Sequence, residues 1–490
     1  MDKRALLMDR SKPGRSAARL PPCDVPLAPL PDAALLRGDL PLPEVSEPEI
    51  VRYFTHLSQM NYGVDTGFYP LGSCTMKHNP KVNDDIAALP GMAMLHPLQD
   101  PATVQGALSV MWDVQQMLAE ISGLPAVSLA PIAGAHGEFA GIQIIRAWQI
   151  ARRQGHRNTI IIPDSAHGTN PASAAMAGYR VVAIPADAQG NIDVERLRAA
   201  LTPDVAGLMI TLPSTLGLFD RHIAEVCRLV HAAGGLVYGD GANLNAILGQ
   251  VKLGDLGFDV AHINLHKTFS TPHGGGGPGA GPVCVSKELA PYLPTPIVAR
   301  RGARYTLATP RRSIGRLGAF HGNFGVLLRA CAYMRTMGAD GMREISRNAV
   351  LNANYVKSRL AGAYRLPYDR PCMHEVVFSA ANLRPHGIRA LDVAKRLIDY
   401  GFHPPTMYFP LVVEEALMIE PTETETKETL DDFIDAMLAI AREAREQPDL
   451  LRQAPHNTPV GRLDEALAAR KPDLRWRPAV PSPSLPPPAP

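Results

Sequence analysis

Long apolar runs, paired cysteines and an excess of one charge are all missing from this sequence of 490 residues. No apolar stretch reaches the roughly 20 residues that cross a bilayer, and the first residues lack the continuous apolar segment of a secretory signal. The six cysteines form no CxxC pair, so we expect reduced thiols in a cytoplasmic protein with no metal site. A formal net charge of +2 gives no electrostatic case for a nucleic-acid partner.

What the chain does contain is ordinary globular material, with 46% hydrophobic and 20% charged residues. Changes in composition predict four parts. Residues 1–95 form an N-terminal arm and partner-contacting segment, and residues 96–330 form a large domain. Residues 331–447 form a small C-terminal α+β domain, and residues 448–490 form an extension with a Pro-rich tail.

Short apolar runs alternate with helix-like stretches through the large domain. Strands are expected at Thr159–Pro163, Arg180–Ile184, Gly207–Thr211, Leu236–Tyr238, Ala261–Leu265 and Val283–Val285, and helices at Val194–Leu201 and Ile223–Ala233. Strand–helix alternation with nearly continuous apolar strands predicts a mainly parallel sheet covered on both faces. In such α/β folds, the chemistry gathers beyond the carboxyl ends of the strands.

The later part of the chain changes character. Helical stretches from Gly325 to Met337 and from Met342 to Leu360 precede a predicted strand, Glu375–Ser379. A last amphipathic helix is expected over Thr429–Glu446. These elements predict the smaller α+β domain.

Two strand ends in the large domain carry charged side chains. An apolar run delivers Lys267 to its carboxyl end, and a second apolar run upstream closes on Asp240. A buried carboxylate is costly without a cation or hydrogen bonds. Together these groups suit pyridoxal 5'-phosphate (PLP), because a lysine forms its imine and an aspartate keeps its ring nitrogen protonated. Taken without the other, each residue has a simpler interpretation: Lys267 as a solvated loop residue, and Asp240 as a turn or helix-cap residue.

Two loops fit the same site. Ala135 and His136 lie in a small-residue loop that opens a helix, where free N–H groups can hold a phosphate. His167 follows a predicted strand, and its imidazole can stack on the ring of PLP. The alternatives are a common tight turn and a surface histidine.

The glycines from Gly274 to Gly279 match the dinucleotide pattern GxGxxG, but prolines surround them and an extended run follows. They are interpreted as a loop that approaches a cofactor closely, not as a Rossmann turn. His262 and His266, four residues apart on a strand-like run, are not adjacent enough to indicate a metal site.

The longest motifs resemble one family over nearly the whole chain. They are Gln59-Met-Asn-Tyr-Gly-Val-Asp, Phe68-Tyr-Pro-Leu-Gly-Ser-Cys-Thr-Met-Lys77, Ala133-Gly-Ala-His-Gly-Glu, Asp164-Ser-Ala-His-Gly-Thr-Asn-Pro-Ala, Pro213-Ser-Thr-Leu-Gly, Asp240-Gly-Ala-Asn and Asn264-Leu-His-Lys-Thr-Phe. In this order they are similar to the glycine cleavage system P-protein, in the form of subunit 2 of glycine dehydrogenase (decarboxylating).

The resemblance implies an α/β protein of PLP-dependent transferase fold type I. It implies that Lys267 is the Schiff-base lysine, that Asp240 pairs with the pyridinium and that His167 stacks on the ring. Ala135, His136, Ala242 and His266 complete the implied cofactor site. Where family members usually have Thr-Asn-Pro-Ser-Thr, this chain has Leu212, which puts a polar role at that position in doubt.

The implied reaction decarboxylates glycine through a PLP aldimine and transfers the aminomethyl group to the lipoyl arm of H-protein. The implied partners are lipoylated H-protein and subunit 1, in a heterotetramer with two copies of each subunit. Cys74 is either a redox-sensitive thiol near the lipoyl channel or a buried structural cysteine. Arg316, His321 and Asn323 are open candidates for holding the glycine carboxylate.

Two other interpretations remain at this point. A different PLP enzyme of the same fold, such as an amino-acid decarboxylase or a cysteine desulfurase, would share Lys267 and Asp240. A non-catalytic scaffold would have lost its chemistry, whereas this chain keeps both residues.

Overall fold

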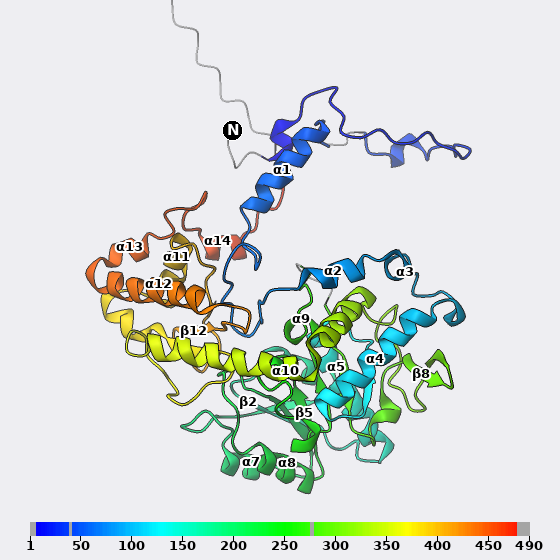
Figure 1. Ribbon diagram of the computed structural model, residues 1–490, viewed down its shortest axis with the longest axis vertical. Coiled ribbons are helices and arrows are strands. Elements are labelled where there is room, and N and C mark those ends of the chain that lie inside the picture. Colours follow the sequence, from blue (N-terminus) through cyan, green and yellow to red (C-terminus); the bar gives the residue numbers. More distant parts are fainter. Residues whose placement is uncertain (1–5, 39–41, 275–278, 478–490) are drawn as a thin grey trace, which may run out of the picture. The chain divides into compact units, whose positions relative to one another are not determined.

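The computed structural model describes residues 6–38, 42–274 and 279–477, and it divides into two compact units (Figure 1). The first combines residues 1–66 with residues 455–490, and the second is Gly67–Ala454. The predicted Pro-rich tail at 478–490 and most of the glycine stretch, 275–278, lie outside the described residues. None of the described helices has the length and hydropathy needed to span a bilayer.

The first unit has short helices and almost no core. Its elements are η1 (Leu7–Arg10), η2 (Ala33–Leu35), α1 (Glu47–Gln59) and α14 (Glu465–Arg470). Ser46 begins α1 with a capping box, in which Glu49 accepts hydrogen bonds from the Ser46 main-chain N–H and hydroxyl. Val51 and Phe54 of α1 are exposed. Exposed apolar side chains on an arm with so little core are typical of a segment that packs against another surface.

A seven-stranded sheet organises the second unit. Its order is β1-β7-β6-β5-β4-β2-β3, with bounds β1 (Ala126–Ser128), β2 (Thr159–Pro163), β3 (Arg180–Ile184), β4 (Val205–Thr211), β5 (Leu236–Asp240), β6 (Val260–His262) and β7 (Val283–Val285). Strands β2 to β6 pair in parallel, and β7 runs antiparallel to β6 and β1. The prediction of a mainly parallel sheet is confirmed.

Both faces of this sheet are buried. Along β2, Ile161 belongs to one apolar cluster, whereas Ile160 and Ile162 belong to another. Val237 and Tyr238 of β5 are divided in the same way. Side chains alternate between the two faces of a strand, so nearly continuous apolar strands are expected when helices cover both faces.

Helices accompany the strands as the alternating pattern predicts. The helices of this part of the unit are α2 (Lys81–Ala87), α3 (Pro90–Ala93), η3 (Pro101–Thr103), α4 (Gln105–Ser122), α5 (Gly134–Ala151), α6 (Thr169–Met176), α7 (Val194–Ala200), α8 (Ile223–Ala232), η4 (Leu244–Ala246), η5 (Gly254–Leu256), α9 (Leu265–Thr268) and η6 (Ala290–Tyr292). A two-stranded ribbon, β8 (Ile297–Arg301) with β9 (Arg304–Ala308), adjoins α4.

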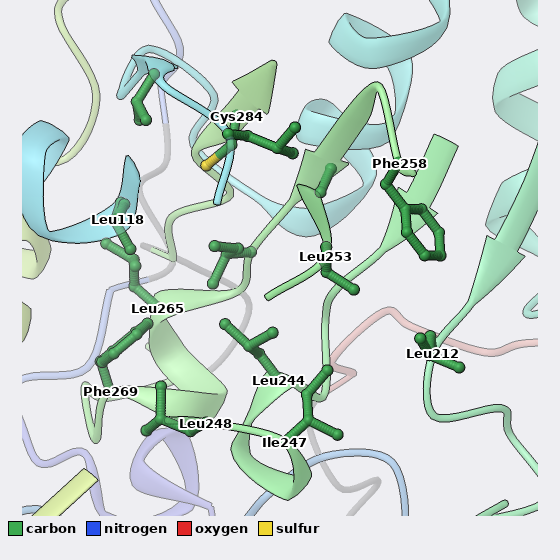
Figure 2. Packing of buried hydrophobic residues seen from close by; sticks show 14 of the residues in the cluster. Leu118, Leu212, Leu244, Ile247, Leu248, Leu253, Phe258, Leu265, Phe269 and Cys284 are labelled. Carbon is green, nitrogen blue, oxygen red and sulfur yellow. The ribbon is translucent and has the colours of Figure 1, made fainter. Parts of the chain in front are cut away.

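One apolar cluster lies beneath the short helix α9. Leu265 and Phe269, on either side of Lys267, pack in it with Leu118, Leu244 and Leu248 (Figure 2). Leu265 and Phe269 are both fully buried. The main chain that carries Lys267 is therefore anchored by apolar side chains on both sides.

The long helix α10 (Phe324–Leu360) connects this sheet with a smaller layer. Its regular geometry is interrupted at Gly338, which has φ 60° and ψ −174°. This interruption lies between the two helical stretches predicted from the sequence. Helix α10 continues across residue 330. The predicted domain limits at 95, 330 and 447 stay predictions.

The smaller layer contains a sheet of order β10-β12-β11, with β10 (Val376–Ser379), β11 (Thr406–Met407) and β12 (Ala416–Ile419). Its helices are η7 (Ala380–His386), α11 (Ala390–Asp399), α12 (Lys427–Glu446) and α13 (Pro448–Arg452). Phe433 and Met437 of α12 are fully buried in its core together with Phe68. The segment after Phe68 also bridges to β12, through Leu71 and Ile419.

Candidate functional site

The carboxyl ends of β5 and β6 lie side by side. Asp240 ends β5 and His262 ends β6, and the two residues are paired in the parallel register. Both side chains are buried. The site therefore lies where an α/β sheet is expected to hold its chemistry.

Hydrogen bonds hold the Asp240 carboxylate. It accepts from the Ala242 main-chain N–H at 3.0 Å and from Asn170 Nδ2 at 3.2 Å, and its Oδ1 lies 3.5 Å from His262 Nε2. Burial raises the pKa of Asp240, but His262 and the Ala242 amide outweigh it, so the pKa lies below its ordinary value. The group is ionised at neutral pH, as a partner of a protonated ring nitrogen must be.

Lys267 lies on the short helix α9 and not on a strand. The strand β6 ends at His262, so the prediction that a strand continues to Leu265 and delivers Lys267 is wrong in this detail. The chain turns into a helix there because the Lys267 and Thr268 amides bond back to the Asn264 carbonyl, at 3.1 and 3.3 Å.

Lys267 is a half-buried residue, and among the described residues its ammonium has no hydrogen bond or ion pair. Its charge nevertheless lowers the pKa of Asp240 and, behind the larger effect of burial, opposes the rise in the pKa of Glu138. An amine left unpaired beside ionisable groups is available for covalent chemistry.

His167 lies in the loop between β2 and α6, as the sequence predicts. Its Nδ1 is 2.8 Å from Thr169 Oγ1, and its ring packs edge-on against Phe409 at 5.7 Å between ring centres. Burial lowers the pKa of His167, and the nearby Asp240 opposes this. A neutral imidazole therefore lies close to the Asp240 carboxylate.

Glu138, on the first turns of α5, is a part of the site that the sequence reasoning missed. It accepts from Thr169 Oγ1 at 2.7 Å and from Asn170 Nδ2 at 2.8 Å. Burial, together with the charge of Asp240, raises the pKa of Glu138 to about 7. The signal for it in the sequence is the acidic residue that ends the motif Ala-Gly-Ala-His-Gly-Glu, on the helix start that carries His136.

Ala135 and His136 occupy the first turn of the 18-residue helix α5. First-turn N–H groups have no acceptor within their own helix. The main chain here is closely approached, since a Cβ on Gly134 would lie 2.5 Å from Asn264 Oδ1. His136 Nδ1 accepts from the Ile132 N–H at 3.3 Å, and burial lowers the pKa of His136.

His266, also on α9, faces the far end of the glycine stretch. Its Nδ1 accepts from the Ala280 N–H at 3.4 Å, and its ring lies edge-on to His273 at 5.3 Å. Burial and His273 lower the pKa of His266 to about 3. A Cβ on Gly279 would lie 3.0 Å from His266 Nδ1, so a larger residue there would press against this ring. The GxGxxG interpretation itself falls mostly on 275–278, outside the described residues.

A second missed group lies behind Asp240. The Tyr238 hydroxyl is 2.5 Å from His262 Nδ1, and both side chains are fully buried. Burial raises the pKa of Tyr238 well above its ordinary value and lowers that of His262. His262 Nε2 has no hydrogen-bond partner among the described residues and faces the Asp240 carboxylate at 3.5 Å, so the Tyr238 hydroxyl orients the imidazole that lies behind the carboxylate.

The motif from Phe68 to Lys77 brings a buried ammonium to the site. Lys77 Nζ bonds Glu423 Oε1 at 2.6 Å and the Thr268 carbonyl at 2.9 Å. Cys74 in the same segment is half-buried, and burial raises its pKa to about 11. So high a pKa leaves little thiolate and favours the interpretation of a structural thiol.

The three candidates for holding a carboxylate have other partners. Asn323 Nδ2 donates to the Gly279 carbonyl at 2.6 Å, and His321 Nε2 lies 3.1 Å from the Pro97 carbonyl. Arg316 reaches the Ala319 carbonyl at 3.5 Å. Their assignment stays open. Leu212, in contrast, is buried in the apolar cluster of Figure 2, where it has no polar task.

Comparison with known protein families and structures places the fold. Residues 140–296 match aminotransferase class-V, and residues 345–458 match the family described as glycine dehydrogenase, C-terminal domain. A crystal structure of glycine decarboxylase (P-protein) of the glycine cleavage system, in inhibitor-bound form, superposes with a TM-score of 0.68 at 20% identity. It covers 86% of this chain and 92% of that chain. A cysteine desulfurase from Thermococcus onnurineus NA1 gives 0.61 at 15% identity over 77% and 95%. The predicted PLP-dependent transferase fold type I is confirmed.

Full-length relatives are much closer in sequence. A probable glycine dehydrogenase (decarboxylating) subunit 2 of Caldanaerobacter subterraneus subsp. tengcongensis is 58% identical over 96% of this chain and 98% of its own length. A protein of the same description from Halalkalibacterium halodurans is 56% identical over the same shares. The chain belongs to the family of glycine dehydrogenase (decarboxylating) subunit 2.

Proposed function

We propose that this chain decarboxylates glycine with PLP bound at Lys267 and transfers the remaining aminomethyl group to the lipoyl arm of H-protein. The observation that carries the proposal is the pair formed by an ionised, buried Asp240 at the end of β5 and an unpaired Lys267 on α9, which follows the neighbouring strand β6. The resemblance of the chain to glycine dehydrogenase subunit 2 selects glycine among the amino acids.

The residues present fit PLP. Buried polar atoms without a partner among the described residues include Thr211 Oγ1 at the end of β4, Asn170 Oδ1 on α6 and Asn264 Oδ1 just before α9. Such atoms are costly unless a ligand satisfies them. When bound, PLP supplies a protonated ring that accepts electrons as the bond to the carboxylate breaks.

Each residue has a distinct task in this proposal. Lys267 would hold the aldehyde carbon, and Asp240, with Ala242 beside it, would hold a proton on the ring nitrogen. His167 would cover one face of the ring. Ala135 and His136, with His266, would hold the phosphate at the start of α5, where the helix dipole favours an anion.

The geometry keeps these charges in place. The hydrogen bonds of Asn170 join Asp240 to Glu138, so the two carboxyl groups are oriented by one amide. His167 and His266 have lowered pKa values because of burial and remain neutral. The proton that faces the ionised Asp240 would therefore be on the ring nitrogen of PLP and not on the imidazole of His167 or His266.

The proposal extends to partners. The name of the relatives, subunit 2, supports a complex with subunit 1, which we place in a heterotetramer with two copies of each chain. The exposed apolar side chains of residues 1–66 offer a surface for it. A cytoplasmic location is part of the proposal and agrees with six cysteines that form no disulfide.

One experiment tests the core of the proposal. The purified chain with subunit 1 and PLP should show a visible imine band that borohydride bleaches, with the reduced adduct mapped to Lys267. Exchange of labelled bicarbonate into glycine should require lipoylated H-protein for full rate. Lys267→Ala should lose both the band and the exchange, and a variant that keeps both would refute the assignment.

A further inference from the structure

A second pair of buried carboxyl groups lies within electrostatic reach of Lys267. Glu375 immediately precedes β10 and Glu420 immediately follows β12, and these antiparallel strands pair Val376 with Ile419. Both glutamates therefore lie at the same end of the small sheet. Both are fully buried, with 0% exposure.

The loop after Gly72 binds both carboxyl groups through main-chain amides. Ser73 N–H donates to Glu375 at 2.6 Å, whereas the N–H groups of Cys74 and Thr75 donate to Glu420 at 3.1 and 2.8 Å. The Thr75 hydroxyl adds a bond to Glu420 at 2.6 Å. Ser73 and Thr75 adopt left-handed φ values of 61° and 51°, a costly conformation that turns their amides in this direction.

His374 points into the same place without a hydrogen-bond partner. Its Nε2 lies 3.7 Å from Glu375 and 4.0 Å from Glu420, and both ring nitrogens are unsatisfied within the described residues. The side chain is fully buried. A mobile proton shared by the carboxyl groups would let this ring make a hydrogen bond that it lacks in the ionised arrangement.

Few positively charged groups among the described residues can neutralise the two glutamates. The described titratable groups that interact with them are Lys267, Cys74, Cys372, His273 and His374. Burial keeps Cys74 protonated, with a pKa of about 11, and His374 neutral, with a pKa of about 3. Burial also lowers the pKa of His273. Lys267 is thus the one cation in this group, and Asp240 shares it.

The short distances between the Glu375 and Glu420 carboxyl groups disfavour a state in which both are ionised. One oxygen of each glutamate and one nitrogen of His374 lie within 4.8 Å of one another. Like charges this close, on two fully buried side chains, cannot both be ionised cheaply. In agreement, burial and the neighbouring carboxyl group raise the pKa of Glu375 well above its ordinary value, and burial raises that of Glu420.

We propose that Glu375 and Glu420 share one proton at neutral pH and form an acid–base pair that relays a proton between the substrate amine and Lys267. The inference rests on the proposed function. An amino acid arrives as an ammonium ion, whose nitrogen must lose a proton before it can attack. An N–H bond breaks and an O–H bond forms on the pair. That O–H bond then breaks as an N–H bond forms on the released amine of Lys267, so no further reactant is needed.

Infrared spectroscopy of the protein without PLP tests the shared proton directly. At mildly alkaline pH, where Glu138 with its pKa of about 7 is mostly ionised, a protonated-carboxyl band that shifts in deuterium oxide is expected. Glu375→Gln and Glu420→Gln should each remove or displace it. Glu415→Gln is the matched control, because Glu415 is also buried but is paired with Arg384 and Arg389. Absence of the band from the unaltered protein would overturn the proposal.

Exchange kinetics test the relay in the complete complex. Glu375→Gln should keep the imine band but slow bicarbonate–glycine exchange by about a hundred-fold, the lower range for acid–base catalysis. The pH profile of the remaining activity should lose the ionisation of the pair, whereas Glu415→Gln should retain it. Unchanged kinetics and profile in both Glu375→Gln and Glu420→Gln would refute the relay.

The outcomes separate this inference from the function on which it rests. If the unaltered complex forms no imine, the proposed function fails while the infrared result still stands. If elemental analysis finds one divalent metal per chain that Glu420→Gln removes, the cluster holds a cation in place of a proton and the inference is overturned.

Discussion

The buried ammonium of Lys77 donates to the main-chain carbonyl of Thr268, 2.9 Å away and one residue beyond Lys267. Glu423 neutralises Lys77 at 2.6 Å, and the Tyr333 hydroxyl accepts from it at 3.2 Å. A residue 190 positions upstream thus holds the turn that carries the candidate Schiff-base lysine. The bond acts on the carbonyl at the end of α9, where a cation is favourable.

Lys77→Met should destabilise the protein strongly. Removing one partner of a buried ion pair leaves Glu423 uncompensated and costs about 3–5 kcal/mol. Urea unfolding should show this loss as a lower midpoint. Lys252→Met, which breaks a surface pair with Glu120, is the control and should cost no more than about 1 kcal/mol. Equal effects of the two changes would contradict the role of Lys77.

Asp240→Asn should weaken PLP binding while the fold is kept. The amide preserves the shape but removes the charge, and a hydrogen bond to a charged group contributes about 1.5–3 kcal/mol. Titration of the imine absorbance with PLP should therefore give a dissociation constant about ten-fold or more higher. Asp204→Asn, at a surface pair with Arg180, should leave it unchanged. A wild-type affinity in Asp240→Asn would argue against contact with the ring nitrogen.

Glu138 should make stability depend on pH. The ordinary pKa of a glutamate, taken for the unfolded chain, is 4.5, and the pKa of Glu138 in the folded protein is about 7. Between these pH values the folded protein therefore binds more protons than the unfolded chain. Stability is then present below pH 4.5 and is lost as pH rises to about 7, by up to about 3 kcal/mol. The free energy of unfolding of the PLP-free protein, measured below pH 4.5 and above pH 7, gives this loss. In Glu138→Gln this part of the pH dependence should vanish; its persistence would assign the effect to other groups.

Gly338→Ala should strain the break in α10. Its φ of 60° and ψ of −174° lie in a region that only glycine occupies readily, and other residues lose about 1–3 kcal/mol there. Thermal unfolding should show a lower midpoint. Gly106→Ala is the matched control, because this α4 glycine has open space around its Cβ position and should gain about 0.5–1 kcal/mol. A stabilised Gly338→Ala would mean that the helix can straighten.

Local pattern was enough for much of the fold. The strands Thr159–Pro163, Arg180–Ile184 and Val283–Val285 have the predicted bounds, because apolar β-branched runs between turns have few alternatives. Pattern failed at Lys267, where the apolar run continued past the true strand end at His262. Only Ala261 and His262 of the predicted strand Ala261–Leu265 pair with neighbouring strands, and pairing is a tertiary property.

The sequence by itself determined the kinds of chemical group: a lysine, a carboxylate that closes a strand and a helix start with small residues. The contacts of Glu138, Lys77 and the pair Glu375 and Glu420 were decided only by the tertiary structure. Their partners lie 31 to 346 positions away along the chain. Burial and the proximity of other charges set what such groups do, and neither is encoded in local spacing.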